Sequence, residues 1–209
     1  MDVRSARIGD VDPVARCITL AFATDPVWEP ALRRADGRTD HLEPYWLRFV
    51  AAAVDQGTAF MTDGGEAVAI WVPPGGDELP PAGVDALDAF LEDNLDADAV
   101  RAMDTLYDRF EASRGPLGPH YYLSLLATHP HHRGRGVGQA LLAANLASWD
   151  DAGVPSYLES TNPANDHRYA RAGFRPIGGF ETVLDRAWVT AMWRDVGGAS
   201  VRQGAAASD

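Results

Sequence analysis

A run of glycine, arginine and histidine at residues 129–142 restricts the fold of this chain more than any other segment. An apolar run, residues 121–128, precedes it, and a segment with apolar side chains on one helical face, residues 136–149, follows. This order predicts a strand, a glycine-rich turn and a helix start. Backbone N–H groups at a helix start lack partners within the helix and lie at the positive end of its dipole. The sequence therefore predicts an α/β fold with a phosphate site at this turn, to which Arg133 and Arg135 can add bidentate contacts.

Two common phosphate-binding motifs do not fit this turn. A Walker A loop needs a lysine, and the chain contains none. The dinucleotide fingerprint shares the spacing of Gly134 and Gly136, and Glu159 follows about twenty residues later, where a ribose-binding acid belongs. However, its third glycine position is Gln139, and a proline separates the strand from the first glycine. A nicotinamide-dependent oxidoreductase is therefore the least favoured alternative.

The remaining pattern, Arg133-x-x-Gly136-x-Gly138, resembles the acetyl-coenzyme A motif of the GNAT family of N-acetyltransferases. A second block supports this resemblance, because members of the family end their core with a strand, an asparagine, a short tyrosine-bearing helix and Gly-Phe. Here a strand-like run at residues 156–161 is followed by Asn162, Asn165, Tyr169, Gly173 and Phe174. The resemblance is specific over residues 119–183 and looser over residues 1–75. It implies one GNAT-type α/β domain, with a central mixed and splayed β-sheet flanked by helices.

This resemblance implies acetyl-coenzyme A (acetyl-CoA) as cosubstrate, with its pantetheine arm in the gap between two splayed strands. Main-chain groups of Leu126, Ala127 and Thr128 would hold the arm, and Asn162 or Asn165 would touch it from the opposite strand end. The pyrophosphate would lie on the loop formed by Arg133, Gly134, Arg135, Gly136, Val137, Gly138 and Gln139. The expected activity is direct transfer of the acetyl group to the amine of a small molecule within a ternary complex.

Acetyl transfer needs a proton acceptor for the attacking amine and a proton donor for the departing thiolate. Tyr169 is the candidate acid, since an ordinary tyrosine is protonated at neutral pH. Many family members carry a glutamate base on the motif strand, but Ser124 stands at that position here. Glu159 on the next strand is the candidate base, with His120 and deprotonation by water as alternatives. A non-catalytic acyl-CoA-binding or sensor module is the alternative function, and it would lack a working acid.

The acceptor pocket is expected in the N-terminal half, which resembles the branch that includes puromycin N-acetyltransferase. Trp28, Tyr45, Trp46 and Trp71 would contribute an aromatic floor, and Asp25 would attract a cationic amine. The net charge of −12 disfavours nucleic acid and anionic membranes as partners. The turn also contains His129, His131 and His132, but no cysteine supports them as metal ligands, so no metal site is expected.

Chain organisation indicates one domain over residues 1–196 and a flexible tail over residues 197–209, which is rich in Gly, Ala and Ser. With one cysteine, no apolar run of eighteen residues and no signal-peptide pattern, we expect a cytoplasmic protein that is a monomer or a homodimer. Periodicity predicts further strands at residues 2–7, 58–62, 66–72, 180–183 and 187–193, and helices at 11–23, at 42–56 and within 77–114.

Overall fold

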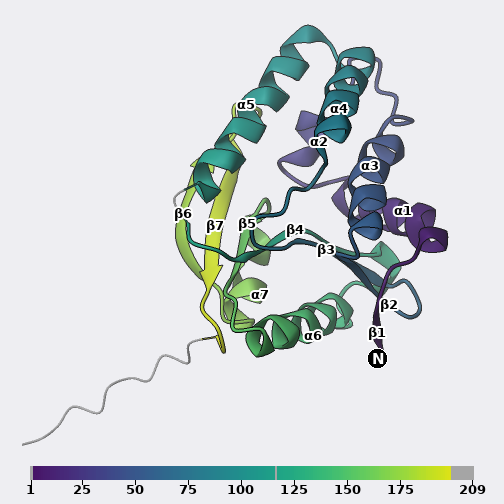
Figure 1. Ribbon diagram of the computed structural model, residues 1–209. Coiled ribbons are helices and arrows are strands. Elements are labelled where there is room, and N and C mark those ends of the chain that lie inside the picture. The colour runs from purple at the N-terminus through teal and green to yellow at the C-terminus, as the bar shows by residue number, and fades with distance from the viewer. Residues whose placement is uncertain (1, 116, 199–209) are drawn as a thin grey trace, which may run out of the picture.

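The computed structural model describes residues 2–115 and 117–198, and the strands of these segments form one mixed sheet (Figure 1). The strand order is β1-β2-β3-β4-β5-β7-β6. The neighbouring strands pair antiparallel, except β4 and β5, which are parallel. The strands are β1 (Val3–Ser5), β2 (Ala59–Thr62), β3 (Ala67–Val72), β4 (Tyr121–Thr128), β5 (Ser156–Ser160), β6 (Arg175–Glu181) and β7 (Trp188–Arg194).

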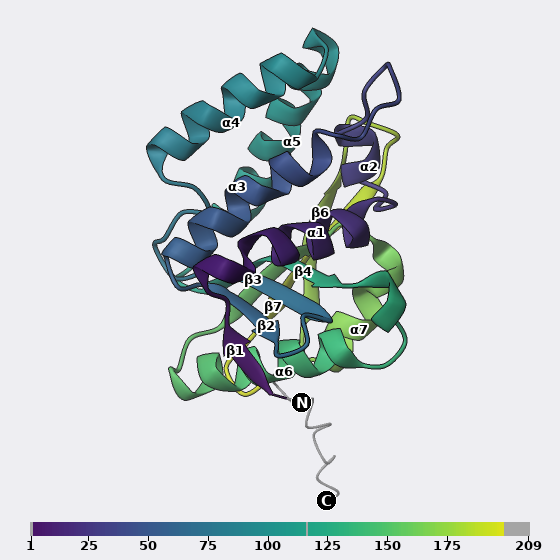
Figure 2. The same cartoon turned by 90° about the vertical axis from the view of Figure 1, so that its right-hand side faces the viewer.

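Helices cover both faces of this sheet (Figures 1 and 2). The first five lie on one side and the last two on the other. They are α1 (Val11–Phe22), α2 (Trp28–Ala31), α3 (Leu42–Asp55), α4 (Pro81–Asn94), α5 (Ala97–Arg114), α6 (Val137–Asp151) and α7 (Asp166–Arg171). Two apolar clusters result: Ile18 and Val50 belong to the cluster under α1 and α3, and Leu142 and Leu146 to the cluster under α6.

The predicted α/β domain with a central mixed sheet is confirmed. The predicted start of the strand at residue 180 is wrong, because β6 begins at Arg175. The first half of β6 was not predicted because it contains Pro176, Gly178 and Gly179. Proline and glycine are rare in strands but tolerated at a sheet edge, which β6 forms. Of the predicted tail, residues 199–209 lie outside the described residues.

A β-bulge in β4 positions the site. Ile70 lies opposite Leu125 and Trp71 lies opposite Leu123, so Ser124 is the extra residue. The bulge reverses the alternation of side chains along β4. Before it, Leu123 packs in the cluster under α6; after it, Leu125 packs in the cluster under α1 and α3.

β4 and β5 then separate. Their parallel pairing covers Tyr121 to Leu123 against Ser156 to Leu158, whereas β4 continues to Thr128. The last residues of both strands therefore border a gap in the middle of the sheet. This is the splay that the sequence resemblance implied.

Candidate functional site

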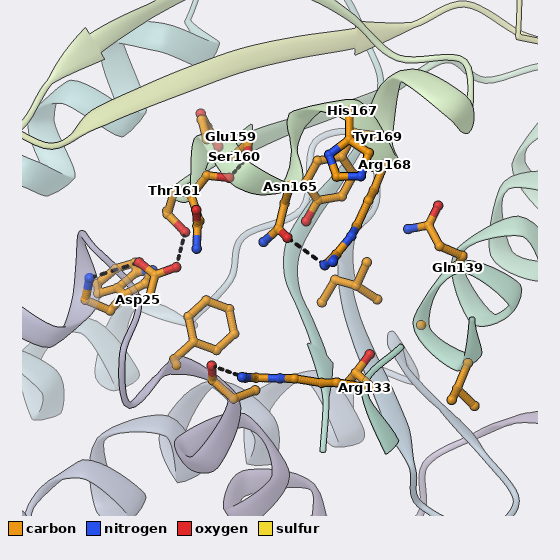
Figure 3. Close-up of a pocket in the computed structure, with 18 of the residues that line it drawn as sticks. Asp25, Arg133, Gln139, Glu159, Ser160, Thr161, Asn165, His167, Arg168 and Tyr169 are labelled. Carbon is orange, nitrogen blue, oxygen red and sulfur yellow. Dashed lines mark hydrogen bonds between the residues drawn. The ribbon is translucent and has the colours of Figure 1, made fainter. Parts of the chain in front are cut away.

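A cavity of about 660 Å³ occupies the gap between β4 and β5 (Figure 3). Its walls come from the end of α1 and the following loop, β4, the glycine-rich turn, the end of β5, and α7. Segments that are far apart in the sequence thus meet around one volume. In Figure 3, Arg133 lies across this cavity from Arg168 and Tyr169.

The glycine-rich turn has the backbone that the sequence predicted. Gly134 and Gly136 adopt φ of 79° and 76°, the left-handed region that side chains with a Cβ avoid, and Gly136 is the N-cap of α6. Gly138 is buried against β4, where a Cβ would collide with the hydroxyl oxygen of Thr128. Two glycines thus shape the turn and the third lets α6 approach the strand. The N-terminus of a fifteen-residue helix is directed at the cavity.

Most of the predicted cofactor residues line this cavity. They are Leu126, Thr128, Arg133, Gly134, Gly136, Val137, Gly138, Gln139, Asn162 and Asn165. Ala127 and Arg135 do not. The side chain of Ala127 is buried in the core, and Arg135 is exposed outside the lining. Arg133 donates to the carbonyl oxygen of Ala21 at 2.8 Å, which ties the turn to the end of α1.

Arg168 and Arg171 on α7 also line the cavity, together with His167, and the sequence reasoning missed them. Arg168 donates to Oδ1 of Asn165 at 2.8 Å. Their spacing of three residues on one helix face was the signal that could have revealed them. With Arg133, these side chains make this part of the cavity cationic although the protein as a whole is acidic.

Tyr169 is half-buried beside Phe174, with its hydroxyl pointing into the cavity (Figure 3). Burial raises the pKa of this hydroxyl to about 12, and the charges of Asp25 and Asp166 act in the same direction. The group therefore keeps its proton throughout the neutral range. The hydroxyl can therefore donate a proton, as a general acid must.

Glu159 lines the same cavity from the end of β5. Burial raises the pKa of its carboxyl group to about 7, while Arg114 opposes this shift and the charge of Glu78 adds to it. The Tyr157 hydroxyl donates to Oε1 at 2.7 Å. Oε2 is buried without a hydrogen-bond partner among the residues that the structure describes. A carboxyl group that is half-ionised at neutral pH and has one free oxygen can accept a proton.

Of the five predicted acceptor residues, Asp25 and Trp28 line the cavity, whereas Tyr45 and Trp46 are buried in the core and Trp71 also lies outside the lining. Asp25 accepts from the backbone of Val27 at 3.0 Å and from the Thr161 hydroxyl at 2.8 Å, and so connects the helical side to β5. Trp28 packs its ring on Phe110, with 5.9 Å between ring centroids. The prediction for Trp71 is wrong, because its side chain is buried under α6, with its indole N–H bonded to Asn145 at 3.0 Å.

Metal ligands do not gather in the described part of the chain, where no group of three or more histidine, cysteine or acidic side chains could hold an ion. Among the helices of these same segments, none has the length and apolar character needed to cross a membrane.

Residues 93–176, which include the glycine-rich turn, Glu159 and Tyr169, match the family described as acetyltransferase (GNAT) domain. Over these residues the chain is similar to the acetyltransferases of this family, which are acyltransferases. The family match thus covers the glycine-rich turn and both candidate proton-transfer groups.

Solved structures share the fold of this chain over nearly its whole length. A Corynebacterium glutamicum protein described as histone acetyltransferase HPA2 and related acetyltransferase is 24% identical, with a TM-score of 0.63, covering 95% of this chain and 98% of that chain. A Drosophila melanogaster polyamine N-acetyltransferase is 15% identical, with a TM-score of 0.65 and coverage of 93% and 99%. A mosquito arylalkylamine N-acetyltransferase-like protein is 17% identical, with the same TM-score and coverage. At these identities the likeness establishes the fold, and the puromycin-like branch stays a prediction.

Proposed function

We propose that this protein is an acetyl-CoA-dependent N-acetyltransferase that moves an acetyl group to the amine of a small molecule by direct transfer in a ternary complex. One observation carries the proposal: an anion-binding helix start, a protonated tyrosine and a carboxyl group with a pKa of about 7 face one cavity. A phosphate site alone fits many ligands. The addition of a proton donor and a proton acceptor fits acyl transfer.

Acetyl-CoA fits the chemistry of this cavity. The N-terminus of α6 and the side chains of Arg133, Arg168 and Arg171 suit its phosphates. The gap between β4 and β5 leaves main-chain groups near Leu126 available to its amide-containing arm. A Cβ on Gly136 would meet nothing within 4 Å, so the turn leaves room for a ligand at that point.

The side chains present support direct transfer. The amine nitrogen attacks the thioester carbonyl, Glu159 takes the amine proton directly or through water, and the C–S bond breaks as the C–N bond persists. Tyr169 then protonates the departing thiolate. The alternative, a covalent acyl-cysteine, has no support, because the single cysteine, Cys17, is buried in the core and burial raises the pKa of its thiol to about 11.

The acceptor class is supported by charge and by structural neighbours. Solved structures with this fold include enzymes named for arylalkylamines, a polyamine and agmatine, all of them amines. Asp25 and Trp28, which line the cavity, are proposed to border the acceptor's reactive end. A non-catalytic acyl-CoA-binding module is the second candidate, and Tyr169 argues against it.

The test of the function is thiol release from acetyl-CoA over a panel of amines, aminoglycosides, polyamines and peptides. We expect release that depends on both the protein and one class of amine, with the acetylated amine found by mass spectrometry. Tight acetyl-CoA binding with no release over the whole panel would instead favour the non-catalytic module.

Gly136→Val should weaken acetyl-CoA binding at least tenfold, about 1.4 kcal/mol, because the branched side chain would stand where the phosphates approach the backbone. Gly153→Val is a matched control. Gly153 follows α6, has φ of 70° and open space around it, so both substitutions impose the same backbone strain. Calorimetry should show weakened binding for Gly136→Val alone. Equal acetyl-CoA affinities in both variants would show that the glycine-rich turn does not bind the cofactor.

Tyr169→Phe should lower turnover by about a hundredfold and leave acetyl-CoA affinity nearly intact, because the ring keeps its packing on Phe174. Since the pKa of Tyr169 is about 12, the parent should show no loss of rate from tyrosine ionisation below about pH 11. Turnover within threefold of the parent, measured with a good acceptor, would make Tyr169 a packing residue.

Glu159→Gln should remove the rise in turnover that ionisation of Glu159 produces near pH 7, and should lower turnover by about a hundredfold above that pH. Stability gives a separate readout. The folded-state pKa is raised from 4.5 to about 7, so the parent loses stability as pH rises through this window and the Gln variant does not. Glu92→Gln, at an exposed position on α4, is the control. A pH profile unchanged by Glu159→Gln would show that water, and not Glu159, accepts the proton of the amine.

A further inference from the structure

A second cavity, of about 910 Å³, lies between α4, α5, the segment at residues 73–79 and the start of β4. Its lining includes the apolar side chains of Leu79 and Leu87 and the ring of Tyr107. α4 and α5 lie above the sheet in Figures 1 and 2 and diverge from their junction in Figure 1. None of the catalytic roles described above is assigned to this cavity.

Carboxylates dominate the lining of the second cavity. They are Asp77, Glu78, Asp88, Asp104, Asp108 and Glu111. Arg114 is the one arginine among the described lining residues, and it lies 3.6 Å from Glu78. In residues 2–115 and 117–198, the other five carboxylates form no ion pair. Burial raises the pKa of Tyr107, and the charges of Glu78 and Asp88 raise it further.

Three of these carboxylates form a stripe along α5. Asp104, Asp108 and Glu111 are spaced by four and three residues, which places them on one helix face toward the cavity. Seven residues of α-helix extend about 10 Å. A stripe of this length suits positive charges separated by several bonds better than one ammonium group.

The two cavities meet at the bulge of β4. Tyr122 lines both, with the Arg114 guanidinium 4.4 Å from its ring centroid. Ser124, which lines the first cavity, donates a hydrogen bond from its hydroxyl to Glu78, which lines the second. A chain of polar groups therefore leads from the acidic cavity to the gap that holds Glu159.

Charge is divided between the two cavities. Arg133, Arg168 and Arg171 line the first, which suits the polyanionic cofactor. The second presents six carboxylates to one arginine, so it repels that cofactor and attracts cations. Tyr122 lines both cavities, so the second cavity is a direct neighbour of the first.

We propose that the second cavity receives the acceptor, and that the acceptor carries at least two cationic groups. Its reactive nitrogen passes Glu78 and Ser124 to reach the gap between β4 and β5, while its distal cation stays among Asp104, Asp108 and Glu111. This inference rests on the proposed acetyltransfer. It adds the route of the acceptor and the class of amine.

The experiment compares two acceptors of equal length, 1,8-diaminooctane and 8-amino-1-octanol, which differ in the charge of the distal group. We expect the parent to prefer the diamine at least tenfold in kcat/KM. Asp104→Asn/Asp108→Asn should reduce this preference at least fivefold, through a raised KM for the diamine. Asp85→Asn/Asp93→Asn is the matched control, since it removes two exposed charges from α4 outside the cavity lining and should keep the parental preference.

Failure of this inference differs from failure of the proposed function. Equal kcat/KM for both acceptors, or the same loss of preference in both double variants, would overturn the inference and leave the acetyltransferase in place. If no amine releases thiol, calorimetry with spermidine, a trication, still tests the cavity. Spermidine binding that weakens in the Asp104/Asp108 variant alone supports it, and absence of binding to the parent overturns it.

Discussion

β4 and β5 are paired in parallel over only three residues each, Tyr121–Leu123 against Ser156–Leu158. Buried main-chain N–H and C=O groups need partners, so strands inside a sheet normally stay paired along their length. Here the bulge at Ser124 turns the rest of β4, and β5 no longer follows it. The opening lets one cavity reach from the loop after α1 to the start of α6. Without this separation, Tyr169 and the glycine-rich turn would not line the same cavity, and the arm of the proposed cofactor would have no unpaired strand edge to bind.

Electrostatics divide the molecule in a way that its net charge of −12 conceals. The arginines of the turn and of α7 gather where phosphates would lie, in a cavity whose walls concentrate their field. The carboxylates of α4 and α5 gather around the neighbouring cavity. Two reactants of opposite charge can therefore be held side by side, each in the place where its partner would be repelled. The separation of β4 and β5 opens the first cavity, and the charges of the lining side chains make the first cavity suited to anions and the second to cations.

The sequence was informative where local backbone chemistry decides the structure. The turn could be predicted because left-handed φ at Gly134 and Gly136 is a local property. Trp71 could not be placed, since β3 is buried on both faces and its pattern does not say which side meets the acceptor. Nor could the contact between Ser124 and Glu78, because they are 46 residues apart and a bulge sets the direction of the serine. Contacts across the sheet depend on register, which a single sequence does not specify in this segment.

Burial acts on both proposed proton-transfer groups and gives them opposite roles. It raises the pKa of Tyr169 to about 12, so the group keeps its proton, and the pKa of Glu159 to about 7, so the group is divided between its two forms at neutral pH. A bound cofactor would exclude more water from the gap and disfavour the ionised carboxylate further. Glu78 acts in the same direction, and Arg114 opposes both. Arg114, in contact with Glu78 and Tyr122, is the largest of the influences that lower the pKa of Glu159, and hydrogen bonds from Tyr157 and Tyr122 act in the same direction.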